Sequence, residues 1–354
     1  MNRIRQLQNL LVKLGTDALY LTHLPDVRWA CGFTGSNGLL IVLPASAHFL
    51  TDGRYASQAA AEVSGADVHV AGYDLIGHLA EAPLLGGVTR AVYQSDHLSV
   101  SAWTELRERL PEVAWTGEEE LLVRLVASKE AREIERIRAA QRLTEAVFEQ
   151  LLTWIRPGLS ERKIAAEIVC RHLKEGAERM SFEPIVASGP NSALPHARPT
   201  GRTLEKGDVV VLDMGGVLDG YASDMTRVVA LGRPDAEARE VFELVLAAQE
   251  RAIADARSGM ASKDVDALAR DVIREAGYGE AFSHSLGHGV GLQVHEWPRV
   301  SHAADYVLPP HCVVSIEPGV YLRDRFGIRI EDLVVLEEDG CRNLTQASKK
   351  WTIL

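Results

Sequence analysis

Two aspartates flank a predicted hairpin in the second half of the chain. Asp213 follows the apolar run 209–212, and Asp224 lies two residues before Thr226. The strong turn signal Asp219-Gly220 lies between them. A two-residue loop there places Asp213 opposite Thr226, so Asp224 points to the same face as Asp213. Because ionised carboxylates buried in apolar strands repel one another, the pair predicts a cation site. The alternative is that one aspartate is a turn or surface residue.

Two glutamates repeat this arrangement further along the chain. Glu317 follows the strand-like run 313–316, and Glu331 ends the next such run, beyond a polar turn near 323–325. Glu317 can oppose Glu331 only across a loop of odd length or past a bulge. Pro318-Gly319 is a natural place for a bulge, because proline cannot donate to a strand ladder. The alternative is an ordinary edge hairpin with solvated acids.

A glycine-rich segment between the two acid pairs contains three histidines, His284, His288 and His295. Its glycines allow the backbone to approach a site closely. The segment is not a phosphate loop, because it has neither Gly-Lys-Ser/Thr nor the G-x-G-x-x-G order. A lone histidine is more often a structural polar residue. Beside two facing acid pairs, one neutral imidazole instead completes a ligand set suited to two hard-to-borderline divalent ions.

The composition is that of an ordinary globular protein, with 354 residues, 46% hydrophobic and 25% charged. Its 38 Lys and Arg against 49 Asp and Glu give a formal net charge of −11, which leaves no basic footprint for nucleic acid. No apolar run approaches the ~18 residues of a membrane helix, and the first residues lack the apolar core of a signal peptide. The four cysteines form no C-x-x-C pair, which favours reduced thiols. We therefore expect a cytoplasmic protein that binds neither nucleic acid nor membrane.

The length favours two domains. Residues 1–122 predict a small α/β domain with a mixed sheet, because helical patterns alternate with short strand-like runs. The helix is expected at 3–14 and the strands at 18–22, 39–42, 68–71, 91–93 and 113–116. The second domain, 123–354, opens with a long helix that Ser128 is expected to cap.

An internal duplication is predicted within the second domain. The segments 156–175 and 257–276 each open a helix, and each follows a long amphipathic helix, 131–155 and 236–256. The offset of about 101 residues grows slightly later in the chain. We expect two similar halves about a pseudo-two-fold axis, with a site that takes its residues from both.

The motifs resemble those of the pita-bread metallopeptidases, which include Xaa-Pro dipeptidase (prolidase), aminopeptidase P, methionine aminopeptidase and creatinase. The resemblance lies in a five-ligand signature made of Asp213, Asp224, His288, Glu317 and Glu331. It covers about residues 128–348, and the first 120 residues resemble, more weakly, the N-terminal domain of creatinase and the proline-specific members.

This resemblance implies the fold class, an α/β (α+β) protein. A creatinase-type α/β domain at 1–122 would precede a pita-bread catalytic domain at 123–354, built from pseudo-two-fold duplicated halves. The N-terminal domain would mediate a homodimer, and the segments Phe33–Asn37 and Asp52–Tyr55 would cap the partner's site.

The resemblance also implies a centre with two divalent metal ions per subunit. Asp224 and Glu331 would bridge the ions. Asp213 would complete the ligand set of one ion, and His288 with Glu317 would complete that of the other. A water between the ions would be the nucleophile, with Glu317 as proton shuttle. Manganese is the first expectation, while cobalt and zinc accept the same ligands.

Residues around the ligands would contact the substrate, according to the same resemblance. His295 would hydrogen-bond the scissile carbonyl. His196 matches the second outer histidine and, with His284, would line the proline side of the pocket. Arg329 would orient ligands or substrate. Arg299, in the segment that follows His295, would pair with the free carboxylate of a prolyl residue.

The expected activity is hydrolysis of the Xaa-Pro bond in dipeptides, so the partner is a small peptide with proline at the second position. Such a bond is a tertiary amide without an N–H. The alternative within the family is aminopeptidase P, which acts on longer Xaa-Pro-Yaa peptides. Creatinase uses this fold without metal and is disfavoured by the complete ligand set. A non-catalytic binding protein would be indicated by missing ligands, and none is missing.

Overall fold

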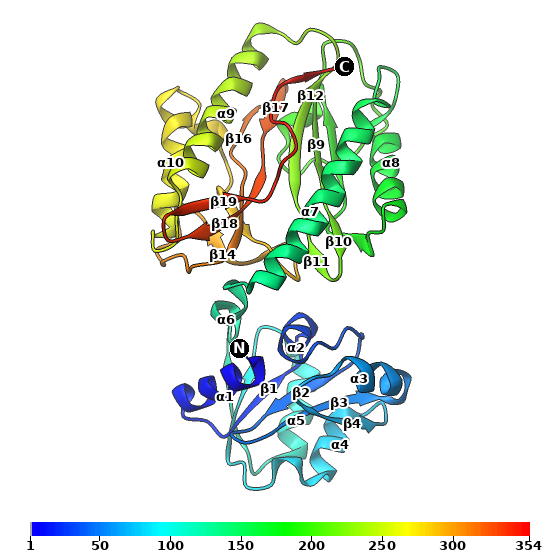
Figure 1. Ribbon diagram of the computed structural model, residues 1–354, viewed down its shortest axis with the longest axis vertical. Helices are drawn as coiled ribbons and strands as arrows, with labels where there is room; N and C mark the ends of the chain where they lie inside the picture. The colour runs from blue at the N-terminus through cyan, green and yellow to red at the C-terminus, as the bar shows by residue number, and fades with distance from the viewer. Residues whose placement is uncertain (1) are drawn as a thin grey trace. The chain divides into compact units, whose positions relative to one another are not determined.

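The computed structural model describes residues 2–354. The chain divides into two compact units, Met1–Val126 and Ala127–Leu354. Each unit consists of β-sheet flanked by helices (Figure 1). Within residues 2–354, no helix has both the length and the apolar character needed to cross a membrane.

The first unit contains a mixed six-stranded sheet in the order β4-β3-β2-β1-β5-β6. Its strands are β1 (Ala18–Leu21), β2 (Leu39–Val42), β3 (Ala47–Asp52), β4 (Asp67–Ala71), β5 (Arg90–Gln94) and β6 (Ala114–Glu118). Its helices are α1 (Arg3–Leu14), α2 (Leu24–Cys31), α3 (Ala56–Glu62), α4 (Leu75–Glu81) and α5 (Val100–Arg109), and α6 (Val123–Ala127) follows at the division between the units. The predicted mixed α/β architecture is confirmed.

Helix α1 ends at Gly15, as its pattern predicts, and this glycine has the left-handed φ of 62° that a helix cap requires. The sequence did not reveal strand β3, because two of its residues are polar although buried. Thr51 donates to the carbonyl of Asn37 at 2.6 Å, and Asp52 accepts from the Asn37 amide and from Arg54. These tertiary hydrogen bonds permit polar residues in a buried strand.

The second unit contains four long helices, α7 (Ala131–Leu152), α8 (Glu161–Lys174), α9 (Ala236–Asp255) and α10 (Ser262–Glu275). Its larger sheets have the orders β20-β12-β9-β8 and β14-β13-β15-β18-β19, and its smaller ones β11-β10-β7 and β16-β17. In Figure 1, α7 and α8 lie on one side of these strands and α9 and α10 on the other. The strands are β7 (Arg179–Met180), β8 (Ile185–Ser188), β9 (Val209–Met214), β10 (Gly216–Leu218), β11 (Tyr221–Ala222), β12 (Met225–Ala230), β13 (Gly287–Gly289), β14 (Glu296–Val300), β15 (Val313–Ile316), β16 (Gly319–Leu322), β17 (Phe326–Arg329), β18 (Asp332–Glu337), β19 (Gly340–Asn343) and β20 (Thr352–Ile353).

The cap of α7 differs from the prediction. Glu130 caps this helix in a capping box with Glu133, and Ser128 instead donates to the carbonyl of Pro310 at 2.8 Å. The helix therefore begins after Ser128, because Glu130 and Glu133 satisfy the first backbone N–H groups reciprocally.

The duplication is visible in matching hydrogen bonds. The N–H of Gly158 donates to the carbonyl of Leu204, and Gly259, 101 residues later, donates to Leu308. The first residue of α8 donates its N–H to Arg202, and the first residue of α10 does the same to Tyr306. The expected pair of similar halves is thus confirmed, including an offset that increases along the chain.

The two hairpins keep the registers that bring their acids together. Asp213 lies opposite Thr226 in the β9–β12 ladder, as the turn at 219–220 predicts. In the second hairpin, Ile316 pairs with Asp332 and Gly319 with Arg329, so Glu317 and Glu331 occupy opposing positions. The loop 323–325 has the odd length that this register requires, and no bulge at Pro318-Gly319 is involved.

Strand β9 shows how the core is divided between the halves. Val210, Leu212 and Met214 pack in a cluster with residues of α7 and α8. Val209 and Val211 pack in a second cluster with residues of α9 and α10. Because side chains alternate along a strand, Asp213 shares the face of Val209 and Val211 and points toward the second half.

A buried histidine makes the stability of this unit pH-dependent. His172 of α8 is fully buried, and its ring contacts the carbonyl of Ile168 and the hydroxyl of Thr144. Burial lowers the pKa of His172 below its ordinary value of 6.5. Below that pH the unfolded chain takes up a proton that the folded protein does not.

We expect the free energy of unfolding to fall as the pH is lowered from 7.5 through 6.5, with a contribution from His172 of at most about 1.4 kcal/mol per pH unit. Denaturant titrations of the protein and of His172→Gln at several pH values measure this. The variant is less stable overall but loses less stability on acidification. Parallel pH curves for the two proteins would contradict the assignment.

Candidate metal centre

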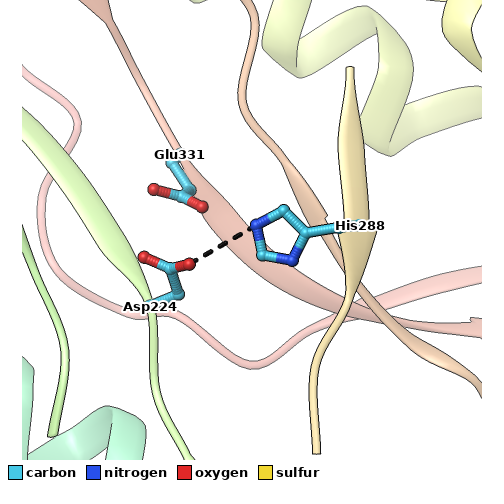
Figure 2. A group of neighbouring side chains, drawn as sticks. All are labelled: Asp224, His288 and Glu331. Atoms are coloured by element: carbon cyan, nitrogen blue, oxygen red, sulfur yellow. Dashed lines mark ion pairs between the residues drawn. The ribbon is translucent and has the colours of Figure 1, made fainter. Parts of the chain in front are cut away.

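Three side chains from separate strands converge in the second unit (Figure 2). Asp224 lies just before β12, His288 within β13, and Glu331 just before β18. One potential ligand atom from each lies within 4.8 Å of the others. The Nε2 of His288 is 3.6 Å from the Oδ2 of Asp224. Each half of the duplication therefore contributes to one cluster.

The other two predicted ligands adjoin this group. Glu317 lies directly after β15, and its Oε1 is 3.3 Å from the Nε2 of His288. Asp213, near the end of β9, accepts a hydrogen bond from the Nη2 of Arg329 at its Oδ2, at 2.6 Å. Its other oxygen, Oδ1, is buried without a hydrogen-bond partner among residues 2–354. A buried carboxylate oxygen without a hydrogen-bond donor is available to bind a cation.

Two glycines allow the strands to approach closely enough for this convergence. A Cβ at Gly215 would lie 2.0 Å from the carbonyl oxygen of Ser223, beside Asp224. A Cβ at Gly287, next to His288, would lie 1.9 Å from the carbonyl oxygen of Ser315. Any side chain at either position would push apart the backbone segments that hold the acids.

The cluster carries an excess of negative charge. Burial raises the pKa of Asp224 and of Glu331 well above their ordinary values, and the neighbouring carboxylates raise both further. Burial and Asp213 also raise the pKa of Glu317 to about 7, although Arg329 opposes this. Four carboxylates thus lie around the buried guanidinium of Arg329, and divalent cations would offset their repulsion.

The imidazole of His288 is oriented as a metal ligand. Its Nδ1 lies 3.1 Å from the carbonyl oxygen of Gly289. A proton on Nδ1 donated to that carbonyl leaves the lone pair on Nε2, which faces Asp224 and Glu317. Burial lowers the pKa of His288, so the neutral form that a metal requires is favoured.

Arg329 connects the ligands to their surroundings. Besides Asp213, it donates to the hydroxyls of Thr226 at 3.0 Å and Tyr321 at 2.7 Å. Thr226 in turn donates to Glu331 at 2.7 Å. Arg329 therefore contacts Asp213 directly and Glu331 through Thr226, while its role in orienting ligands stays a prediction.

Sequence reasoning missed three supporting hydroxyl groups, those of Thr226, Ser315 and Tyr321. Ser315 donates to Glu317 at 3.1 Å and accepts from the backbone of His288. The alternation of side chains along a strand could have identified two of these hydroxyl groups, because Ser315 and Tyr321 lie an even number of residues from Glu317 and share its face. Thr226 was already placed opposite Asp213.

The three other histidines of the predicted site lie around the predicted ligands. The ring of His295 meets the ring of His288 edge-on, with centroids 4.3 Å apart. His284 lies 3.0 Å from the hydroxyl of Tyr321. Desolvation lowers the pKa of both His284 and His295 to about 4, so both are neutral at pH 7. His196 is exposed, and it follows Pro195, whose carbonyl accepts from the arginine that binds Asp213.

Arg299 lies directly opposite His288 in the register of strands β13 and β14. Directly opposed residues of antiparallel strands present their side chains on the same face. Arg299 is exposed, and its Nε donates to the hydroxyl of Ser285 at 3.2 Å. An accessible guanidinium therefore lies on the face of the sheet that carries a metal-ligand candidate.

Comparison with known proteins agrees with this architecture. Residues 3–126 match the creatinase/prolidase N-terminal domain, and residues 135–338 match metallopeptidase family M24. The chain is 36% identical over 352 residues to the uncharacterized peptidase YqhT of Bacillus subtilis, covering 99% of this chain and all of that one.

Two solved structures are similar over nearly their whole length. The Xaa-Pro dipeptidase from Bacillus anthracis superposes with a TM-score of 0.96 at 35% identity, covering 99% of both chains. The X-Pro aminopeptidase from Thermotoga maritima superposes with a TM-score of 0.91 at 37% identity, covering 96% of this chain and 98% of the other.

Fold and site together define a metallopeptidase in which a creatinase-type domain precedes a pita-bread catalytic domain. The chain belongs to metallopeptidase family M24. The resemblance and the fold class inferred from the five-residue signature are thereby confirmed. The family depends on metal, and Asp224, His288 and Glu331 form a candidate binding triad.

Replacing Asp224 should have opposite effects with and without metal. Because repulsion and burial raise its pKa, we expect Asp224→Asn to raise the melting temperature of the metal-free protein, by about 2–4 °C per kcal/mol relieved. Manganese should stabilise the wild-type protein by about 2.7 kcal/mol at a hundredfold excess over its Kd, and this gain should be lost in the variant.

Thermal unfolding with and without chelator measures both effects. Asp324→Asn is the matched control, because Asp324 is an exposed turn residue whose φ of 61° asparagine tolerates. An Asp224→Asn protein that manganese stabilises like the wild type would remove Asp224 from the centre.

Proposed function

We propose that this metallopeptidase hydrolyses the Xaa-Pro bond of dipeptides, using two divalent ions per subunit. The observation that carries the proposal is the cluster of four carboxylates and one neutral imidazole, of which Asp213, Asp224 and Glu331 are buried, with an exposed arginine on the same face of the sheet as that imidazole. The Xaa-Pro dipeptidase from Bacillus anthracis, which superposes over the whole chain, supports this substrate class.

The proposed ligands are the five residues of the signature. Asp224 and Glu331 would be shared by the two ions, Asp213 would complete one ligand set, and His288 with Glu317 would complete the other. This donor set of carboxylates and one imidazole fits manganese first, while cobalt and zinc also accept it. When bound, such ions activate a water and polarise the scissile carbonyl.

The remaining residues act on substrate and protons. Glu317 shuttles the proton from the attacking water to the prolyl nitrogen. His295 donates a hydrogen bond to the carbonyl oxygen as charge develops there. His196 and His284 line the side of the pocket that receives the proline ring.

Arg299 is the proposed determinant of substrate length. A dipeptide presents its free prolyl carboxylate close to the scissile bond, whereas a longer peptide presents an amide there. A guanidinium binds a carboxylate through charge-assisted, bidentate hydrogen bonds. Arg299 therefore favours the dipeptide.

The second candidate is an aminopeptidase P, which releases the first residue of longer Xaa-Pro-Yaa peptides. The structural similarity to the X-Pro aminopeptidase from Thermotoga maritima favours it, since the identity of 37% is comparable to that with the dipeptidase. The two candidates share the metal centre and differ only in what binds the carboxyl side of the proline.

Two of the sequence-based expectations remain predictions. One is that the chain is a cytoplasmic homodimer. The other is that its N-terminal domain caps the partner's site through Phe33–Asn37 and Asp52–Tyr55. The metal centre described above does not depend on either.

Kinetics on matched peptides separate the two candidates. With manganese present, we expect kcat/KM for Ala-Pro to exceed that for Ala-Pro-Ala and for the amide Ala-Pro-NH₂, because only the dipeptide carries the carboxylate. Ala-Ala is the control for the proline requirement. Cleavage confined to the longer peptide would establish the aminopeptidase instead.

Removing the guanidinium tests its role directly. We expect Arg299→Ala to raise KM for Ala-Pro by about 10- to 100-fold, the loss of a charged hydrogen-bonded contact worth about 1.5–3 kcal/mol. KM for Ala-Pro-NH₂ should change little. Arg323→Ala is the matched control, since Arg323 is exposed in the turn between β16 and β17. Equal effects on both substrates would exclude carboxylate recognition by Arg299.

A further inference from the structure

The segment 188–200 carries His196 and is irregular after its short 3₁₀ helix. It begins at the end of β8, includes the short 3₁₀ helix Gly189–Ala193, and ends at Thr200. Irregular segments position a side chain accurately only when other groups hold their backbone. Residues outside this loop must therefore hold it at the metal centre.

One face of the loop contacts the centre itself. The carbonyl of Pro195 accepts from the Nη1 of Arg329 at 3.1 Å, and Arg329 also binds Asp213. The hydroxyl of Ser192 accepts from the backbone N–H of Gly327 in β17 at 2.9 Å. These two contacts hold the loop from Ser192 to Pro195, the residue before His196, against β17 and Arg329.

The two ends of the loop meet at one carboxylate. Glu161, the first residue of α8, is fully buried. Its Oε1 accepts from the backbone N–H and the hydroxyl of Ser188, at 2.8 and 2.7 Å. Its Oε2 accepts from the N–H and the hydroxyl of Thr200, at 2.8 and 2.6 Å, and from the amide of Asn191 at 2.9 Å. A single side chain thus joins the start, the interior and the end of the loop.

This carboxylate does not cap its own helix, because the N-cap of α8 is Ser160. All five donors belong to the loop, and none belongs to the backbone of α8. Burial alone would raise the pKa of Glu161, but the hydrogen bonds from Thr200 and Ser188 lower it below its ordinary value. The carboxylate is therefore held ionised by the loop that it organises.

The second half of the duplication has a counterpart at the equivalent position. Ser262, the first residue of α10, is also fully buried. Its hydroxyl donates to the carbonyl of Arg299 at 2.7 Å and accepts from the N–H of Ser301 at 2.9 Å. In both halves, the first residue of the helix holds a segment that carries a predicted substrate-contacting side chain.

We propose that Glu161 is the positioning residue for His196: by joining Ser188, Asn191 and Thr200, it fixes the loop that brings this histidine to the substrate pocket. The kinetic part of this inference rests on the proposed function. The anchoring of the loop is independent of it.

The substitution Glu161→Gln tests the proposal. It keeps the shape of the side chain, but its NH₂ group faces donors where a carboxylate oxygen accepted. We expect kcat/KM for Ala-Pro to fall by about 10- to 100-fold, the effect of a small displacement of a substrate-contacting group. Manganese content should stay at the wild-type level, because the loop carries no ligand. Glu167→Gln on the same helix is the matched control, since Glu167 is partly exposed and forms an ion pair with Arg171 at 2.8 Å.

A double-mutant cycle distinguishes positioning from general destabilisation. If Glu161 acts through His196, the double variant Glu161→Gln/His196→Ala is no slower than His196→Ala alone. Multiplying effects, or an unchanged kcat/KM in Glu161→Gln, would overturn the proposal. Should Glu161→Gln fail to fold, Thr200→Val removes one donor only and should show a smaller loss with the same non-additivity.

Amide hydrogen exchange keeps the test separate from the proposed function. Residues 189–200 should exchange faster in Glu161→Gln than in the wild type or in Glu167→Gln, and the NMR signal of the His196 ring should shift. If the wild type cleaves neither Ala-Pro nor Ala-Pro-Ala, the proposed function fails and these two measurements alone decide the anchoring. Unchanged exchange and an unchanged His196 signal would reject it.

Discussion

The second unit is organised around an electrostatic imbalance: three buried carboxylates and the partly buried Glu317 lie around the buried guanidinium of Arg329. Ionised carboxylates in a poorly hydrated site repel one another strongly, and Arg329 compensates only part of that charge. The rest of the site follows from this constraint. The hydroxyls of Thr226 and Ser315 each donate to a carboxylate, and one oxygen of Asp213 has no donor within residues 2–354. The arrangement is electrostatically costly without metal, and bound cations would lower that cost.

The duplication explains how one chain gathers so much charge in one place. Each half contributes a hairpin whose ladder is interrupted beside its acids, between β9 and β10 in the first and between β15 and β16 in the second. The pairing registers continue across both interruptions. The two acids of each hairpin therefore lie on the same face of the sheet. Apolar packing against α7 and α8 on one side, and α9 and α10 on the other, buries both hairpins.

Buried polar groups hold the loops around this rigid centre. Glu161 closes the loop of His196. Asp266 binds Arg270 and the N–H of Leu286, and Arg270 donates to the carbonyl of His284. The ion pair of Lys129 with Glu296 adjoins His295, and its side chains are 2% and 6% exposed. Removing one partner of such a pair leaves an uncompensated buried charge, so these anchors specify loop geometry as well as stability.

The amino-acid sequence by itself determined helix α1, the four long helices of the second unit, five of the six strands of the first sheet, the shared face of the acids in each hairpin and the duplication. These features depend on period-two and helical patterns within short stretches of chain. It also contained the five-residue signature of the family. The tertiary structure decided how the two hairpins meet, that Arg329 binds Asp213, that Tyr321 joins the site, and that Glu161 closes a distant loop. Those contacts join residues far apart in the chain, and no local periodicity encodes which of the possible long-range pairs will form.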